Sequence, residues 1–150
     1  VPKNISLENI KTLDDLKKSK ESKVLNNIIQ FEFGNQHKKR IEEWFNSVLP
    51  NSRVFAKTRT YEVTLSMVQS GRGVAVVPAL AARLGGKKID FDVNLYKTNL
   101  PKRKIISLIP SQYVRIEPYK SFIEALVETG KKMQLPKTYK VPPILESLSI

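Results

Sequence analysis

Thr58, Arg59 and Thr60 have the clearest chemical potential, because they follow a short apolar run and precede an amphipathic stretch. Threonine hydroxyls accept hydrogen bonds from amides that lack partners at a helix start, and that end of a helix favours negative charge. The Arg59 guanidinium can bind a carboxylate through two parallel hydrogen bonds. The pattern predicts a binding corner for a small anion, such as an organic acid. Two alternatives remain open, with Thr60 as a plain helix cap and Arg59 as a surface charge.

A second set of polar candidates follows another expected strand. Asn35 and Gln36 lie in an expected loop, residues 34–37, directly after the apolar run 28–33. Open α/β sheets bind ligands beside the carboxyl ends of their strands, so both amides are candidate ligand contacts. His37 is the single histidine and there is no cysteine, so we expect no metal site, no thiol chemistry and no cofactor.

No residue pattern indicates catalysis. The paired carboxylates at 14–15 and 42–43 are sequence neighbours, so their side chains diverge instead of meeting at one substrate atom. Ser66 and Ser70 have no base nearby in the sequence, and Gly71-Arg72-Gly73 lacks the spacing of a phosphate-binding loop. We therefore expect that the chain is not an enzyme.

A β-α-β unit over residues 53–86 would position the first set of candidates. The pattern predicts a strand at 53–57 and a helix at about 61–70, ended by Gly71, with Gly73 in the following turn. The run Val74–Val77 shows no alternation, which predicts a strand covered on both faces. Pro78 closes it before a short helical run at 79–84.

The flanking sequence repeats this alternation. It predicts strands at 28–33, 89–96 and 104–110, helices at 37–48 and 117–133, a short helix capped by Thr12, and a mobile connector at 17–23. The first long helix carries a stripe of Ile41, Trp44, Phe45 and Val48, which we expect to be buried.

Several of these features form an ordered set: Thr58, Thr60, Val68, Gly71, Gly73, Val74, Ala75, Val77 and Pro78, with Ile41 and Trp44 upstream and the run 122–126 downstream. In this order they resemble the second half of the effector-binding domain of LysR-type transcriptional regulators. The resemblance covers roughly residues 1–133. It implies an α/β fold, a Rossmann-like subdomain of the type II periplasmic-binding-protein class with a mixed, mostly parallel sheet flanked by helices.

The resemblance also implies an organisation of the chain. Residues 1–23 would be an entry segment, 24–97 effector-binding subdomain II, 98–133 a return strand and C-terminal helix toward subdomain I, and 134–150 a C-terminal tail. Most of subdomain I and a DNA-reading winged helix would be missing, and the first residue is Val, so we expect a piece of a longer protein. The tail could pack Ile144, Leu145 and Leu148 on a neighbour.

The implied function is effector sensing. By resemblance, the loop with Thr58, Arg59 and Thr60 lines the effector cleft, and Val77 and Pro78 lie near its wall. A small, anionic metabolite would modulate DNA binding by a separate N-terminal winged helix-turn-helix. The resemblance further implies a cytoplasmic homodimer or homotetramer, with contacts through the helix at 37–48 and the strand at 53–57.

Composition leaves two alternatives open. The formal net charge is +12, but the basic residues are scattered in small groups without interleaved aromatics, which indicates solvated surface more than a nucleic-acid interface. No apolar run reaches membrane-spanning length and no signal peptide is visible, so we expect no membrane contact. The alternatives are a fragment of a periplasmic-type solute-binding protein and a basic nucleic-acid-binding module, whose DNA binding would be salt-sensitive.

Overall fold

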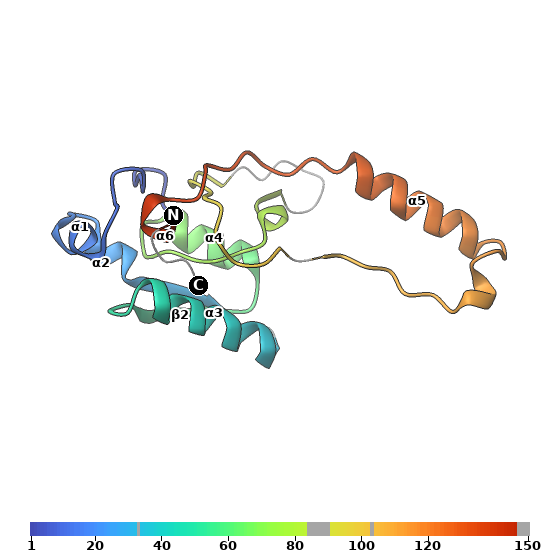
Figure 1. The fold of residues 1–150 in the computed structure, drawn as a ribbon, viewed down its shortest axis with the longest axis horizontal. Coiled ribbons are helices and arrows are strands. Elements are labelled where there is room, and N and C mark those ends of the chain that lie inside the picture. The colour runs from blue at the N-terminus through green and yellow to red at the C-terminus, as the bar shows by residue number, and fades with distance from the viewer. Residues whose placement is uncertain (33, 84–90, 103, 147–150) are drawn as a thin grey trace. The chain divides into compact units, whose positions relative to one another are not determined.

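The computed structural model describes residues 1–32, 34–83, 91–102 and 104–146 (Figure 1). The chain divides into two units, one holding Val1–Pro101 with Pro136–Ile150 and the other holding Lys102–Leu135. Helices and a small parallel sheet make up the structure, so the expected α/β class is confirmed in this coarse form.

The sheet of the larger unit has two strands within the part of the chain that the structure describes. β1 (Asn27–Phe31) and β2 (Arg53–Thr58) run parallel, with Phe31 opposite Thr58 and an irregularity in register between Ile28 and Ile29. On the other edge of β1, Val74 forms a single parallel bridge with Ile28. The Val74 amide donates to the Asn27 carbonyl at 2.9 Å, and the Ile29 amide donates to the Val74 carbonyl at 2.8 Å.

The first strand and the helix of the predicted β-α-β unit form, but its second strand does not. α4 (Tyr61–Gln69) begins after Thr60 and ends before Gly71, which has the left-handed φ of 70° that suits glycine. The predicted strand at 74–77 is wrong beyond Val74. The chain leaves β1 there and continues to Pro78, whose nitrogen has no hydrogen to donate, and into the 3₁₀ helix η1 (Ala79–Arg83).

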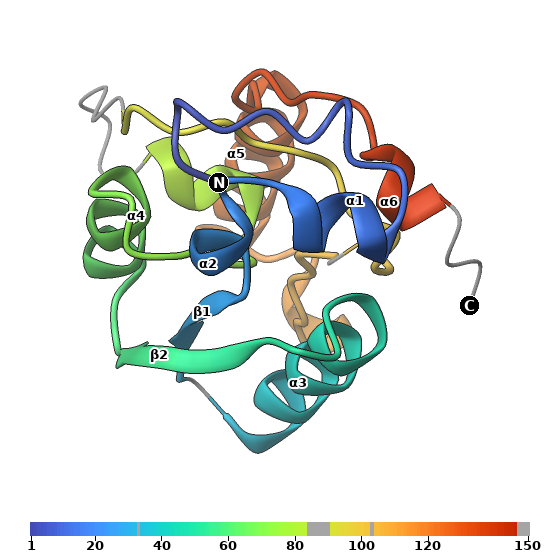
Figure 2. The same cartoon turned by 90° about the vertical axis from the view of Figure 1, so that its left-hand side faces the viewer.

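Two helices cover the sheet from different sides (Figure 2). α3 (Asn35–Val48) buries Trp44, Phe45 and Val48 of the predicted stripe, in a core cluster with Ile28 of β1. Ile41, the fourth residue of the stripe, is only partly buried and packs against this cluster. Successive residues of a strand point to opposite faces, so Ile29 faces the other way, toward the α4 layer. Two helices thus enclose the short strands.

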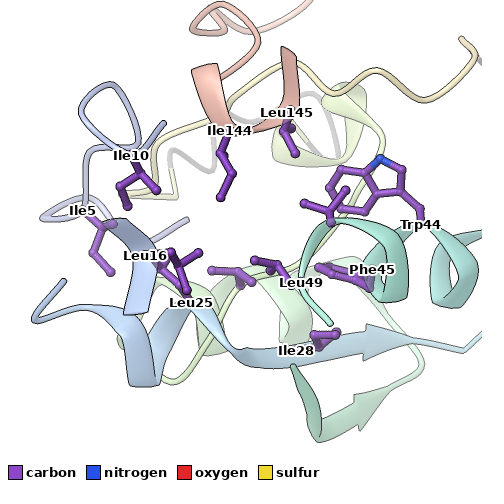
Figure 3. Close-up of a cluster of buried hydrophobic side chains, with 12 residues drawn as sticks. Ile5, Ile10, Leu16, Leu25, Ile28, Trp44, Phe45, Leu49, Ile144 and Leu145 are labelled. Carbon is purple, nitrogen blue, oxygen red and sulfur yellow. The ribbon is translucent and has the colours of Figure 1, made fainter. Parts of the chain in front are cut away.

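The core cluster extends from the sheet to both ends of the chain (Figure 3). α1 (Leu13–Lys18), α2 (Ser22–Leu25) and α6 (Pro143–Glu146) contribute to it, and the predicted cap at Thr12 is confirmed as a capping box with Asp15. The buried aliphatic side chains outside the sheet layer are Ile5, Ile10, Leu16, Leu25, Ile144 and Leu145. The tail therefore packs on the core of its own chain, while Leu148 lies outside the described residues.

The smaller unit contains η2 (Ser111–Tyr113) and α5 (Tyr119–Lys132), close to the predicted helix at 117–133. The predicted strand at 104–110 is wrong, because this described segment has no neighbouring strand to bond its backbone. No residue of α5, all of which is described, is buried. Large apolar side chains are exposed along this unit, including Ile105, Ile106, Leu108, Tyr119, Phe122, Leu126 and Val127.

Candidate functional site

The candidate site is the edge of the sheet where β1 and β2 end side by side. Phe31 and Thr58 are register partners at these ends, and α3 and α4 begin a few residues later. Gly34, with a φ of 67°, turns the chain into α3, and Thr60 is the N-cap of α4. Carboxyl ends of parallel strands and amino ends of helices therefore meet at one edge, where open α/β sheets bind ligands.

The Thr58 side chain is buried and fully engaged. Its Oγ1 lies 2.6 Å from Thr64 Oγ1, and the Thr64 hydroxyl donates to the Thr60 carbonyl at 2.9 Å. The Thr58 hydroxyl also donates to the Gln30 carbonyl at 3.5 Å, and either hydroxyl can be the donor in the pair with Thr64. Thr58 thus holds the corner between β2 and α4 and offers no free hydroxyl to a ligand.

Arg59 and Thr60 are exposed on the corner itself. The Thr60 hydroxyl accepts a hydrogen bond from the Val63 amide at 3.3 Å, so the helix-cap interpretation of this residue is confirmed. Beside them the rings of Phe31 and Tyr61 stack with centroids 4.0 Å apart. The corner thus combines a rigid aromatic pair with a guanidinium that reaches solvent.

The charge of the corner is set by residues that the sequence analysis did not single out. Glu32 Oε1 lies 3.1 Å from Lys57 Nζ and 3.8 Å from Lys38 Nζ. The hydrogen bond from Lys57 lowers the pKa of Glu32, and the charges of Lys57, Lys38 and Arg59 lower it further. Lys38 also lies 3.9 Å from a carboxylate oxygen of Glu42.

These distances join α3 to both strand ends. Lys38 and Lys57 flank the Glu32 carboxylate and the charge of Arg59 also acts on it, while Lys38 alone is paired with Glu42. Glu62 adds a further carboxylate in the first turn of α4, so the charges of these cations and carboxylates balance. The available sequence signal is a charged residue at or just beyond the end of each expected strand. Only the register of β1 on β2 shows that these residues meet.

The remaining predicted ligand contacts are Asn35, Gln36, Val77 and Pro78. Asn35 and Gln36 lie in the first turn of α3 instead of in a loop, so they stay at the candidate edge, and their side chains are outside the described structure. Val77 and Pro78 are half-buried in the segment that follows the Val74 bridge.

A pocket of about 270 Å³ lies elsewhere, between the sheet and α3. Its lining residues are Ile28, Gln30, Ile41, Glu42, Phe45, Asn46, Ser52 and Val54, and none of them is a predicted ligand contact. The Gln30 amide donates to Glu42 at 2.7 Å, while Gln30 Oε1 is buried with no hydrogen-bond partner among the described residues. That oxygen is closed off from solvent, so the pocket does not present it to a ligand.

In the described ranges, no group of three or more histidine, cysteine, aspartate or glutamate side chains is arranged to hold a metal ion. Nor does any described helix have the length and apolar character needed to cross a bilayer. No family model, curated protein or solved structure matches the chain.

Proposed function

We propose that this chain is the effector-sensing part of a LysR-type transcriptional regulator and binds a small anionic metabolite at the candidate edge. The observation that carries the proposal is the meeting of two strand ends and two helix starts beside the exposed cation Arg59. Unpaired amides at helix starts and a bidentate guanidinium both favour a carboxylate.

The residues take different roles in this proposal. Arg59 binds the anion directly, because it is exposed at the corner. Lys57 and Lys38 attract the anion but are shared with Glu32 at 3.1 and 3.8 Å, so the ligand competes with a carboxylate of the protein. Thr58 positions the corner through Thr64 and does not contact the ligand.

The smaller unit supports the idea of a second subdomain. Ile105 and Leu108 are 87% and 88% exposed, and α5 displays an apolar stripe of Tyr119, Phe122 and Leu126. Such a face requires a covering partner, since soluble proteins rarely leave large contiguous apolar patches in water. Residues 98–133 would, in this proposal, complete subdomain I, with Val77 and Pro78 at the wall of the cleft.

Sensing would act through assembly. β2 is an edge strand within the described sheet and exposes Val54 and Phe55 beside α3, which supports a homodimer or homotetramer contact there. An effector can shift the placement of subdomains only if it binds two arrangements unequally. A separate N-terminal winged helix-turn-helix would bind the DNA. The protein would work in the cytoplasm.

A thermal-shift screen tests the proposal. The intact chain is heated with single mono- and dicarboxylic acids, amino acids and aromatic acids, and at least one anion should raise the melting temperature. Arg59→Gln should weaken binding of that anion about 10- to 100-fold, the loss expected for a charged hydrogen-bonding partner. Arg72→Gln, at the opposite end of α4, is the matched control and should keep parent affinity.

Two results would contradict the proposal. One is that no compound stabilises the chain, and the other is that Arg59→Gln and Arg72→Gln bind the anion equally well. Salt-sensitive binding to plain DNA, with indifference to all small anions, would instead support the basic nucleic-acid module.

A further inference from the structure

Three segments that are far apart in the sequence meet in the larger unit. The first is the N-terminal stretch 1–10, the second is 93–97 and the third is 139–145. Pro2 forms an antiparallel bridge with Val93, and the buried Asn94 side chain donates to the Lys3 and Ile5 carbonyls at 3.0 and 2.9 Å. These bonds hold the first two segments together without help from the tail.

The tail adds the third segment through two separate attachments. At the first, Tyr139 forms a parallel bridge with Tyr96, their rings stack at 4.9 Å, and the Tyr139 amide donates to the Leu95 carbonyl at 2.7 Å. At the second, the Ile144 amide donates to the Ile10 carbonyl at 3.1 Å, while the side chains of Ile144 and Leu145 enter the core.

Tyr96 connects all three segments. Its hydroxyl accepts a hydrogen bond from the Leu7 amide at 3.1 Å, and its ring stacks on Tyr139. Pro142 is among the most completely buried side chains of the described chain, so the tail is seated between its two attachments as well. The tail is therefore a docked segment of the larger unit and not a loose extension.

The docking has a topological consequence. The smaller unit, Lys102–Leu135, departs from the larger unit after Pro101 and returns at Pro136. Tyr96 and Tyr139 lie five residues before the departure and three residues after the return, and they form a parallel bridge with stacked rings. A docked tail makes residues 102–135 a loop fixed at both ends, and a released tail would leave them tethered at one end.

We propose that residues 136–146 form a clasp that can open while the sheet stays folded, and that the closed clasp limits the movement of residues 102–135. Closing a loop removes conformations from it, which is the physical source of the restriction. Among the described residues, the backbone hydrogen bonds given between the tail and the rest lie at two points, Tyr139 and Ile144, so the tail can open as a local unit. Resting on the proposed function, the clasp would set how far the effector can rearrange the two subdomains.

The clasp is opened by the double variant Ile144→Ala with Leu145→Ala, made in the full chain. The matched control is Met133→Ala with Leu135→Ala, which removes similar apolar bulk from exposed positions just before the tail. Native-state hydrogen exchange follows the amides of Tyr139 and Ile144, with the sheet amides of Ile29 and Val74 as internal references.

The clasp variant should speed exchange of the tail amides at least about thirtyfold, because two buried aliphatic side chains are truncated. The sheet amides and the control should keep parent rates. The movement of residues 102–135 is followed by electron spin resonance, which measures the distance distribution between spin labels at Glu43→Cys and Lys131→Cys. The chain has no cysteine of its own that would also be labelled. The distance distribution should be broader in the clasp variant than in the parent and the control.

An unchanged distance distribution, with tail amides that exchange freely, would overturn the proposal. Unprotected tail amides in the parent, or sheet amides that open together with the tail, would overturn it as well. Should the double variant fail to fold, Tyr139→Ala replaces it and must also broaden the distribution. No effector is used, so a negative result here leaves the proposed function untouched, and a failed ligand screen leaves the clasp untouched.

Discussion

Gly73→Ala should be among the most damaging small substitutions in the chain. A Cβ built at Gly73 would lie 2.4 Å from the Asn27 carbonyl oxygen and 3.1 Å from its carbon, both backbone atoms of β1. Ordinary contacts need about 3.4 Å or more, so the segment would have to move about 1 Å away from β1. A backbone atom of a central strand cannot give way as the end of a flexible side chain can.

The size of the effect follows from the bonds beside this contact. Moving the segment weakens the two backbone hydrogen bonds between Val74 and β1, at 2.9 and 2.8 Å, each worth about 0.5–1.5 kcal/mol. Overpacking a tight site adds about 1–3 kcal/mol. If the segment moves, the overpacking is relieved but the hydrogen bonds weaken, so the two costs do not add in full. We therefore expect the free energy of unfolding to fall by about 2–4 kcal/mol.

Urea denaturation followed by fluorescence of the buried Trp44 measures this change in the larger unit. Gly130→Ala is the control, because nothing lies within 4 Å of a Cβ at this position of α5 and alanine favours a helix. The reasoning is refuted if Gly73→Ala lowers the free energy of unfolding by less than about 0.5 kcal/mol, the usual scatter for harmless surface changes.

Two further predictions concern helix starts. Thr60→Ala removes the hydroxyl that accepts from the Val63 amide and should lower the free energy of unfolding by about 1 kcal/mol, whereas Thr60→Ser should restore it; equal stabilities of the two variants would refute a capping role. The pKa of Asp15 is lowered by a hydrogen bond with the Thr12 side chain and, to a lesser extent, by hydrogen bonds from the Lys11 and Thr12 amides. The stabilisation that Asp15 provides is therefore present above its unfolded-state pKa and is lost as pH falls through its folded-state pKa. Asp15→Asn should therefore be less stable at neutral pH and lose less stability in acid, and parallel pH profiles of melting temperature would contradict this.

Local signals in the sequence predicted the helices well. Thr60 and Gly71 bracket α4 because a cap hydroxyl and a left-handed glycine act within a few residues of their own position. The stripe on α3 was predicted for a similar reason, since a helical period needs no knowledge of the partner surface.

Strands depend on neighbours, and there the sequence was a poorer guide. Residues 74–77 and 104–110 have strand-like composition, but the first pairs only at Val74 and the second has no strand beside it in the described structure. The site shows the same limit. Thr58 looked available to a ligand, and only the approach of Thr64 from α4 shows that its hydroxyl is engaged.

The exposed apolar stripe of α5 affects how the newly made chain folds, associates and is degraded. An amphipathic helix with no buried residue of its own gains little from folding before its apolar side meets a surface. Before the stripe is covered, chaperones can bind it, copies of the chain can associate through it, and proteases can reach the helix. The abundance of the protein in a cell would thus follow the supply of whatever covers α5, which makes assembly a checkpoint on quality.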